Sequence, residues 1–304
     1  MIESTGRRRA SEARRSEVRA SYLMLSPALL LFVVFLAGPL LGSVVISTLR
    51  WDLLTPPRFA GFDNYVRLTQ DTQLLRALAN TFVFSFWSMV LHLFFGSVLA
   101  LGVNSRLPRG MTYAMKVAYV FPFLLSWSAV SLLWKYILDP NFGFFNYYLK
   151  HWFQMQPPNW LVSEAYALPA IIGVDFWKTL GYTFIIILAG LQTVPENLLE
   201  AGQVDGAGRW KVLFYITLPL LSPTLFFAMV ITFIGAFQIF EPMFIMTKGG
   251  PGNATRSVVQ HLYEAGFQQF NMGYASVVSL LIFAVIMAAT FIQFRVARSW
   301  VHYD

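Results

Sequence analysis

The sequence predicts an all-α integral membrane protein, a bundle of six transmembrane helices. Of its 304 residues, 57% are hydrophobic and only 12% are charged, which is about half the charge of an ordinary soluble domain. Four uncharged tracts, at 20–49, 77–105, 212–240 and 265–294, are each longer than the roughly 20 residues that cross a bilayer as a helix. They are too long for barrel strands, and lipid offers the backbone no hydrogen-bond partners, so each tract is expected to be helical.

The first span, at about 21–48, follows a basic arm at residues 1–19. The arm has no apolar periodicity and no aromatic residue among its arginines, which favours a cytoplasmic topology signal near anionic lipid over a nucleic-acid-binding tail. The apolar segment after it is longer than the core of a cleaved signal peptide, so we expect it to be retained. The arginines of the arm are Arg7, Arg8, Arg9, Arg14, Arg15 and Arg19.

The other spans are predicted at about 77–104, 113–137, 168–192, 220–246 and 272–296, within one transmembrane domain at 20–304. The third has a short uncharged run, and the fourth is interrupted near its start by Asp175 and Lys178. Prolines such as Pro122 leave carbonyl groups without helical partners and tend to kink a helix. The longest loop on the inner side is predicted at 195–223.

That inner loop contains a segment of small and polar residues from Glu200 to Gly208, followed by an apolar stretch that reaches Pro219. Small residues let a backbone approach another surface closely, Gly206 suits the turn after a short helix, and Pro219 suits the start of the next helix. The pattern predicts a compact cytoplasmic docking helix. A simpler interpretation, a turn at Gly206 and a helix boundary at Pro219, is also consistent with it.

The segment resembles the EAA loop of permease subunits from binding-protein-dependent ATP-binding-cassette (ABC) importers. That loop reads Glu-Ala-Ala, three residues, Gly, nine residues, then Ile-x-Leu-Pro, and the spacing here agrees throughout. Gly202 replaces the second Ala, which should weaken the short helix by roughly 1 kcal/mol. We expect Glu200 at the positive end of that helix. The resemblance assigns ATPase coupling to Glu200, Ala201, Gly202, Asp205, Gly206, Ala207, Leu218 and Pro219.

The stretches 246–255 and 273–276 resemble the carbohydrate branch of this family, which includes maltose-type and glycerol-3-phosphate-type permeases. The resemblance covers the chain from the first span onward and implies the fold of a type I ABC importer permease with a cytoplasmic coupling helix. It implies a second homologous permease, two ATPase subunits and an extracytoplasmic solute-binding protein as partners. It also implies a multi-pass protein of the bacterial or archaeal cytoplasmic membrane, with both termini cytoplasmic.

Nucleotide chemistry is expected on the partner ATPase. This chain has no Gly-x-x-x-x-Gly-Lys-Ser/Thr sequence to hold phosphates, so ATP and Mg²⁺ should bind elsewhere. We expect a transport subunit that is not an enzyme and carries no cofactor. The chain has no cysteine, and its four histidines are scattered, so no metal site is expected.

In maltose-type relatives, substrate contacts come from the spans on either side of the EAA loop. The resemblance therefore implies import of a sugar, oligosaccharide, polyol or glycerophosphate-type solute by alternating access, along a pathway between these two spans. Hydroxyl groups and an aromatic ring suit a sugar, and a lysine would also suit a phosphate. The corresponding residues are Lys178, Thr179, Tyr182, Thr232, Ala236 and Ile239.

Two alternatives come from other classes of protein. Ionisable residues within spans are costly and mark functional sites, so Asp175, Lys178 and Glu241 could form the relay of an ion-gradient-driven transporter. Asp175 and Lys178 also share a helix face and could simply neutralise one another. A membrane enzyme is disfavoured because no His/Asp cluster or activated nucleophile is evident.

Overall fold

The computed structural model describes residues 18, 20–104 and 108–302, and it is helical almost throughout. The predicted basic arm at 1–19 lies outside the described residues, apart from Val18. In the described part, strand structure is confined to one antiparallel pair, β1 (Leu49–Arg50) and β2 (Arg58–Phe59). The predicted all-α class is therefore confirmed.

Five helices of the described chain are long and apolar enough to cross a membrane. Two further apolar helices meet at 100°, and the predicted count of six holds when this pair is taken as one span. The five are Ala20–Ser47, which contains η1 (Val33–Ala37) and α2 (Gly38–Ser47); α4 (Thr72–Asn104); α8 (Glu164–Leu191); Arg209–Phe237, which joins α10 (Arg209–Val212), η2 (Leu213–Thr217) and α11 (Leu218–Phe237); and α13 (Met272–Ala297).

The bent pair consists of α5 (Arg109–Leu124) and α6 (Trp127–Ile137), where one continuous span was predicted. Leu125 and Ser126 adopt extended backbone angles between the two helices. Pro122 lies in the last turn of α5 and has no N–H to donate, which weakens the helix just before the break. The amide of Leu125 turns back to the carbonyl of Pro122 at 3.2 Å, and the chain changes direction there.

The fifth span also differs from its predicted range. Its helix starts at Arg209, well before Pro219, and ends at Phe237. Pro219 lies directly after the π-helical turn η2, in which the Leu218 amide bonds to the carbonyl of Leu213. Proline is tolerated there because it supplies no donor to the widened turn. Pro219 lies in the first turn of α11, as predicted, but α11 continues a helix that already runs from Arg209.

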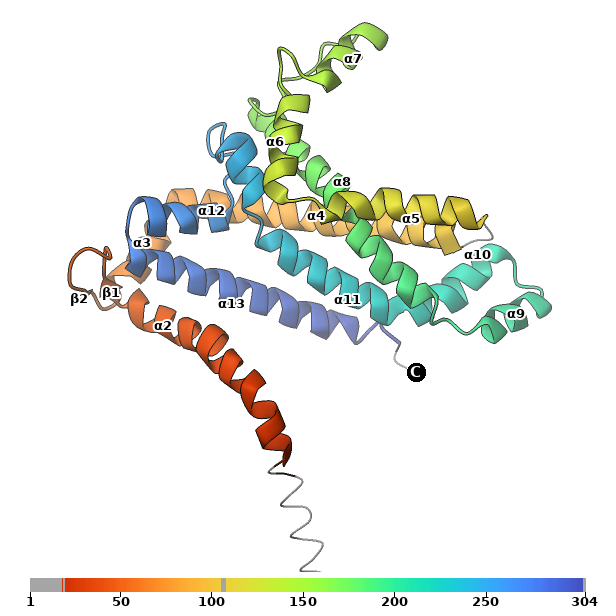
Figure 1. Cartoon of the computed structure of the whole chain (residues 1–304), viewed down its shortest axis with the longest axis horizontal. Coiled ribbons are helices and arrows are strands. Elements are labelled where there is room, and N and C mark those ends of the chain that lie inside the picture. The colour runs from red at the N-terminus through yellow and green to blue at the C-terminus, as the bar shows by residue number, and fades with distance from the viewer. Residues whose placement is uncertain (1–17, 19, 105–107, 303–304) are drawn as a thin grey trace, which may run out of the picture.

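The shorter elements divide between the two ends of the bundle (Figure 1). The α9 end carries α9 and α10. The opposite end, called the hairpin end, carries β1, β2, α3 and α12. Helix α7 stands apart, beyond α6. The bounds are α3 (Asp63–Gln70), α7 (Phe144–Trp152), α9 (Glu196–Val204), η3 (Met243–Thr247), α12 (Val258–Tyr263) and η4 (Glu264–Gln268).

Helix α8 is the centre of the bundle, because α4, α5 and α11 all pack on it. Small residues allow close helix contacts in a membrane, where lipid removes the usual hydrophobic driving force. A Cβ at Gly181 of α8 would collide with the backbone carbonyl of Tyr119 in α5, and one at Gly190 would collide with Thr224 of α11. These glycines set the spacing of the helices around α8.

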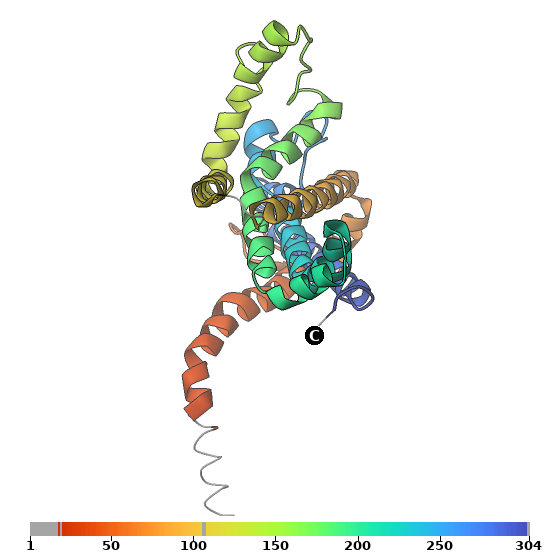
Figure 2. The ribbon, with the colours of Figure 1, turned by 90° about the vertical axis from the view of Figure 1, so that its right-hand side faces the viewer.

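Two segments diverge from this centre. The first helix runs away from the bundle on one side, and α6 and α7 project on the other, as Figures 1 and 2 show from perpendicular directions. The most apolar window of the first helix has no buried residue. An apolar helix of this kind is suited to lipid or to another membrane subunit.

Candidate functional site

The predicted coupling segment forms α9 and the turn after it. Gly206 adopts φ +78°, a left-handed conformation that suits glycine. The Ala207 amide bonds to the carbonyl of Gly202 at 2.9 Å, and the Gly206 amide to that of Gln203 at 3.0 Å. These bonds satisfy carbonyls at the helix end, so the predicted turn at Gly206 is present.

Two details of α9 differ from expectation. The helix begins at Glu196, so Glu200 lies one turn inside it, and the position that favours a carboxylate through the helix dipole is held by Glu196. Gly202 faces inward, where an added Cβ would lie 2.7 Å from the side chain of Ile216. Its small size therefore serves packing within the loop. Ala201 and Gly206 are exposed, which leaves them free to contact a partner.

A groove of about 760 Å³ lies between α9 and the start of the α10–α11 helix. Val204, Trp210 and Tyr215 are each at least 73% exposed around this loop, which is unusual for large apolar side chains in one small region. The residues that line the groove are Leu199, Gln203, Ala207, Gly208, Arg209, Val212, Leu213 and Thr217.

A second cavity, of about 220 Å³, lies within the membrane-spanning part, mainly between α8 and α11. It brings together five of the six residues predicted for the substrate pathway. Those five are Thr179, Tyr182, Thr232, Ala236 and Ile239, and the cavity is completed by Ser88, Phe123, Trp127, Asp175, Thr183, Ile231 and Gly235.

Lys178, the sixth predicted residue, is not among the residues that line the cavity, although its ammonium lies against two of them, Phe123 and Trp127. Its ammonium donates to the backbone carbonyl of Phe123 at 3.2 Å. It also lies 4.7 Å from the centre of the Trp127 ring and 5.5 Å from that of Phe123, in a cation–π arrangement. The lysine thus holds the bend between α5 and α6 against α8.

Asp175 is buried and has partners on α4 that sequence reasoning missed. The Ser88 hydroxyl donates to its carboxylate. His92 lies next in the network, with Nε2 2.7 Å from the Thr179 hydroxyl and Nδ1 2.5 Å from the Ser88 carbonyl. The spacing of Ser88 and His92 along one face of the second span was the available signal.

These contacts bear on both alternative roles of the ionisable residues. Asp175 and Lys178 hydrogen-bond to different partners, but their opposite charges still interact favourably, so mutual neutralisation of the two stays a prediction. Glu241 is exposed, beyond the end of α11, and lies outside the Asp175 network. A relay through Asp175, Lys178 and Glu241 is therefore not assembled.

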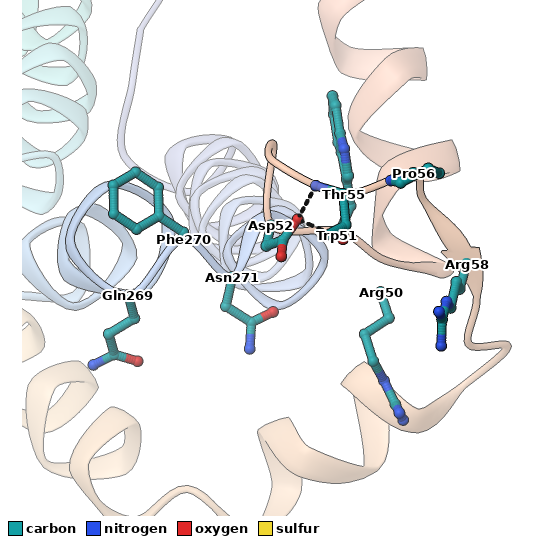
Figure 3. Close-up of a pocket in the computed structure, with 9 residues that line it drawn as sticks. All are labelled: Arg50, Trp51, Asp52, Thr55, Pro56, Arg58, Gln269, Phe270 and Asn271. Atoms are coloured by element: carbon teal, nitrogen blue, oxygen red, sulfur yellow. Dashed lines mark hydrogen bonds between the residues drawn. The ribbon is translucent and has the colours of Figure 1, made fainter.

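A third cavity, of about 320 Å³, opens at the hairpin end between the β1–β2 connection and the start of α13 (Figure 3). Asp52 accepts hydrogen bonds from the Leu54 and Thr55 amides, which fixes the connecting turn. Arg50 and Arg58 are directly opposed across the strand pair, and Arg50 bonds to Asp63 at 2.9 Å. The cavity is lined by Arg50, Trp51, Asp52, Thr55, Pro56, Arg58, Gln269, Phe270 and Asn271.

Close to this cavity, a group of polar side chains joins the α3–α4 junction to α12, η4 and α13, and all of them except Arg67 are buried or half-buried. The Tyr274 hydroxyl donates to Asp71 at 2.5 Å, His261 Nε2 lies 3.2 Å from the same carboxylate, and Arg256 pairs with Glu264 at 2.8 Å. We call this group the hairpin-end polar cluster. It comprises Arg67, Asp71, Arg256, His261, Glu264 and Tyr274.

Asp71 and His261 in this cluster have shifted pKa values. Burial acts to raise the pKa of Asp71, but hydrogen bonds from the Tyr274 hydroxyl and the Leu74 amide outweigh it and hold that pKa below its ordinary value. Burial lowers the pKa of His261 despite the nearby Asp71 carboxylate, and the charge of Arg256 adds to the decrease. Among the described residues, no group of three His, Asp or Glu side chains is arranged to hold a metal ion.

The cavity between two spans and the exposed helix that joins them define a membrane transport subunit. Residues 92–302 match the family described as "Binding-protein-dependent transport system inner membrane component", and the chain belongs to this family. The predicted resemblance to ABC importer permeases is thereby confirmed.

The particular relatives are sugar and glycerol-phosphate permeases. The trehalose/maltose transport system permease protein MalF of Thermococcus litoralis is 33% identical over 297 residues, which cover 95% of this chain and 97% of MalF. The sn-glycerol-3-phosphate permease protein UgpA of Rhizobium meliloti is 30% identical, covering 93% of this chain and 96% of UgpA. These names match the predicted carbohydrate branch.

Solved structures agree on the fold. A chain of a bacterial alginate ABC transporter, solved in complex with an alginate pentasaccharide-bound periplasmic protein, superposes with a TM-score of 0.82 and 25% identity. The match covers 95% of this chain and 96% of the alginate transporter chain. The predicted type I importer permease fold is confirmed.

Proposed function

We propose that this chain is the permease subunit through which an ATP-driven importer moves a sugar, oligosaccharide, polyol or glycerophosphate-type solute into the cell by alternating access. The observation that carries the proposal is the connection between the two cavity walls. Helix α8 ends at Leu191, α9 follows at Glu196, and the helix that contains α11 begins at Arg209. The exposed helix α9 thus lies between the two spans that line the membrane cavity.

This connection supplies a route for coupling. Packed helices transmit displacement because a close-packed protein interior has low compressibility. A movement imposed on α9 acts on the end of α8 and on the start of the α10–α11 helix together. The cavity lies between these two helices, so its opening would change with the position of α9. ATPase closure and the access state of the cavity are linked in this way.

The partner at the α9 end is expected to be an ATPase subunit. Glu200 is exposed and can accept a charge-assisted hydrogen bond from a basic side chain. Ala201 and Gly206 permit close approach, and the exposed Val204 and Tyr215 add apolar area. ATP and Mg²⁺ are assigned to that ATPase, of which an importer of this kind would carry two copies, and this chain would bind neither.

The hairpin end is assigned to the extracytoplasmic solute-binding protein. Two opposed arginines rim the cavity in Figure 3, and like charges held this close create a site that attracts acidic groups. The alginate transporter relative was solved with a periplasmic protein bound, which supports such a partner. The second homologous permease completes the membrane part, in which lipid covers the rest.

This assignment places α9 in the cytoplasm and the hairpin end outside the cytoplasmic membrane of a bacterium or archaeon. The last described residues follow α13 and lie near the α9 end (Figure 1), so the carboxyl terminus is assigned to the cytoplasm. With an amino-terminal span before the hairpin end, the amino terminus falls on the same side.

The test is the double variant Glu200→Ala, Gly206→Trp in the complete importer. We expect normal membrane insertion and subunit assembly of the permease pair, but loss of ATP-dependent solute uptake, because the large indole blocks contact with the ATPase. Glu196→Ala, on the same helix and equally exposed, is the matched control and should retain uptake. Normal uptake by the double variant would contradict the coupling role.

A further inference from the structure

Helix α7 turns an aromatic face away from the rest of the chain. Phe144, Tyr148 and Trp152 follow one another at intervals of four residues and therefore share one side of the helix. Their rings pack edge to face, with centres 4.6 Å apart in both neighbouring pairs. The first and last of these side chains are 65% and 73% exposed. A contiguous exposed aromatic face of this kind marks a contact surface.

The opposite side of α7 is polar and is bound to the protein. Asn146 is 2% exposed, and its side-chain amide donates to the carbonyl of Asp139 at 2.9 Å and accepts from the indole N–H of Trp160 at 2.7 Å. Lys150 follows Asn146 by about one turn and is exposed. Because these hydrogen bonds fix the rotation of α7 from its polar side, the aromatic face is directed outward.

We propose that α7 is an interfacial helix, which lies on the outer leaflet of the bilayer and inserts Phe144, Tyr148 and Trp152 among the phospholipids. Lys150 is directed to the water side. This contact lies outside the transport pathway and depends on neither the solute nor the ATPase. The name of the leaflet rests on the assignment of α9 to the cytoplasm, whereas the contact with lipid does not.

The depth of α7 follows from the helices before it. Helix α5 starts near the α9 end (Figure 1) and has 16 residues, which gives about 24 Å at 1.5 Å per residue. The hydrocarbon layer is about 30 Å thick. Helix α6 then turns by 100°. The chain thus crosses most of the bilayer in α5 and runs along the far leaflet in α6, towards α7.

The aromatic face of α7 continues the exposed apolar surface of α6. Leu133 and Tyr136 are exposed on α6, as suits a membrane helix whose outer side meets lipid. The ring of Tyr136 lies 6.5 Å from that of Phe142, which is also exposed and precedes α7 by two residues. The exposed apolar surface therefore extends from α6 through Phe142 to Phe144.

Lipid suits this face better than a soluble partner does. A solute-binding protein binds and dissociates, so α7 would expose its rings to water between encounters, which is unfavourable for apolar surface. Tyrosine and tryptophan are enriched at membrane interfaces, because the ring lies in lipid while its polar atom reaches water or a headgroup. The polar side with Lys150 completes the pattern of an amphipathic helix that lies in the interface.

The contact also bears on the membrane cavity. Helix α6 begins at Trp127, which lines that cavity, and α7 packs on α6. With α7 anchored among lipids, the part of α6 that is distant from the cavity is restrained by the leaflet. The cavity wall at Trp127 is then held from two sides, by Lys178 of α8 and by the lipid-bound arm.

The test uses the absence of cysteine from the chain. Phe144→Cys and Trp152→Cys place a single thiol on the aromatic face, and Lys150→Cys is the matched control on the other side of the same helix. All three side chains are exposed, so no buried contact is lost. The complete importer, assembled with partner subunits that lack cysteine, is labelled with a nitroxide and placed in nanodiscs of phosphatidylcholine and phosphatidylglycerol. Power-saturation EPR measures collisions with oxygen, which concentrates in lipid, and with a nickel chelate, which stays in water.

We expect the labels of Phe144→Cys and Trp152→Cys to collide mainly with oxygen, at a depth of about 5–10 Å below the phosphates. The label of Lys150→Cys should collide mainly with the nickel chelate. Frequent collisions with the chelate at all three positions would place the aromatic face in water and overturn the proposal. Rare collisions with both reagents on the aromatic face would show that a protein subunit covers it, which contradicts the proposal equally.

Addition of the solute-binding protein tests the remaining partner. If the aromatic face is protected from the chelate only after this protein is added, the face belongs to the solute-binding protein and the proposal is wrong. Neither ATP nor solute is present during the measurement. Failure of the proposed transport function and failure of this inference are therefore distinguishable.

Discussion

Gly181 is the residue at which the α5–α8 contact is tightest. A Cβ there would collide with the Tyr119 carbonyl, whereas a Cβ at Gly173, on the same helix, has nothing within 4 Å. Close packing therefore requires a glycine at position 181 but not at position 173. Sequence alone gives no sign of this difference, because both are single glycines in one apolar span.

We predict that Gly181→Ala destabilises the protein by about 1–3 kcal/mol, as overpacking does in a close-packed core. Gly173→Ala should be neutral or slightly stabilising, because alanine is a better helix former than glycine. The midpoint of thermal unfolding of the purified importer in detergent measures both. Equal midpoints for the two variants would show that α5 can move away from α8 at no cost.

Lys178 carries a second prediction at this scale, because its contacts are with protein groups. Lys178→Met keeps the length of the side chain but removes the hydrogen bond to Phe123 and the cation–π contact, so stability should fall by about 1–2 kcal/mol. The apparent KM for solute uptake should change by less than about twofold, because the substitution removes no contact with the solute. Tyr182→Ala, which removes a cavity wall, should raise KM in the same assay.

At the scale of elements, the sequence located the helices better than their ends. The turn after α9 could be predicted from Gly206 and its spacing from Glu200, because a left-handed residue at a helix end is determined by the nearby sequence. The break between α5 and α6 did not follow, because hydropathy is continuous across Leu125 and Ser126. The early start of the fifth helix was hidden by Pro219, which a π-helical turn accommodates.

The hairpin-end polar cluster makes the stability of this end dependent on pH. Because burial lowers the pKa of His261 below its ordinary value of 6.5, the folded protein keeps the imidazole neutral where the unfolded chain already binds a proton. The unfolded state then binds more protons, so stability is complete above about pH 6.5 and falls as the pH decreases below it. Asp71, whose pKa is also lowered, loses its contribution only as the pH falls through its ordinary value of 3.8 and below.

We therefore predict that the thermal unfolding midpoint decreases between pH 6.5 and pH 5, and that His261→Gln flattens the curve over this interval. The decrease below pH 4, due to Asp71, should survive in that variant and be reduced in Asp71→Asn. His302, which follows α13 and lies outside the hairpin-end polar cluster, supplies the control. His302→Gln should keep the wild-type dependence of the unfolding midpoint on pH. A slope that persists in His261→Gln would assign the effect to another group.

At the scale of the whole molecule, the sequence predicted the membrane class and the exposed α9 loop, and five of the six residues predicted for the substrate pathway line the cavity. Amino-acid composition indicates whether a protein lies in water or in lipid, and a motif with fixed spacing predicts local structure within one loop. The network of Ser88, His92 and Asp175 did not follow, because it depends on how α4 and α8 are rotated against one another. Lys178 was assigned to the cavity lining for the same reason. Helix periodicity predicts which residues share a face of the helix, but it does not predict which other helix that face contacts.

The hairpin end and the α9 end also predict separable effects on the partners. Arg58→Glu should weaken stimulation of ATP hydrolysis by the solute-binding protein, with an increase of about tenfold in the concentration needed. Basal ATP hydrolysis should not change, because α9 is untouched. Lys150→Glu, the same charge change on exposed α7, is the matched control, and an identical effect of both variants would assign the loss to overall charge.

Helix α4 contains 33 residues, which at 1.5 Å each gives a rod about 50 Å long. The hydrocarbon layer of a bilayer is only about 30 Å thick. The third turn of α4 is bound to the neighbouring loop, where Asn80 donates to the carbonyl of Asn253 and Thr81 accepts from the amide of Val258. Helix α4 therefore extends beyond the hydrocarbon layer, and its apolar surface is longer than the layer is thick. A helix longer than the lipid layer adapts by tilting or by thickening the bilayer locally, each at a modest cost, so lipids with longer or shorter acyl chains should change the tilt of α4 and not the fold of the bundle.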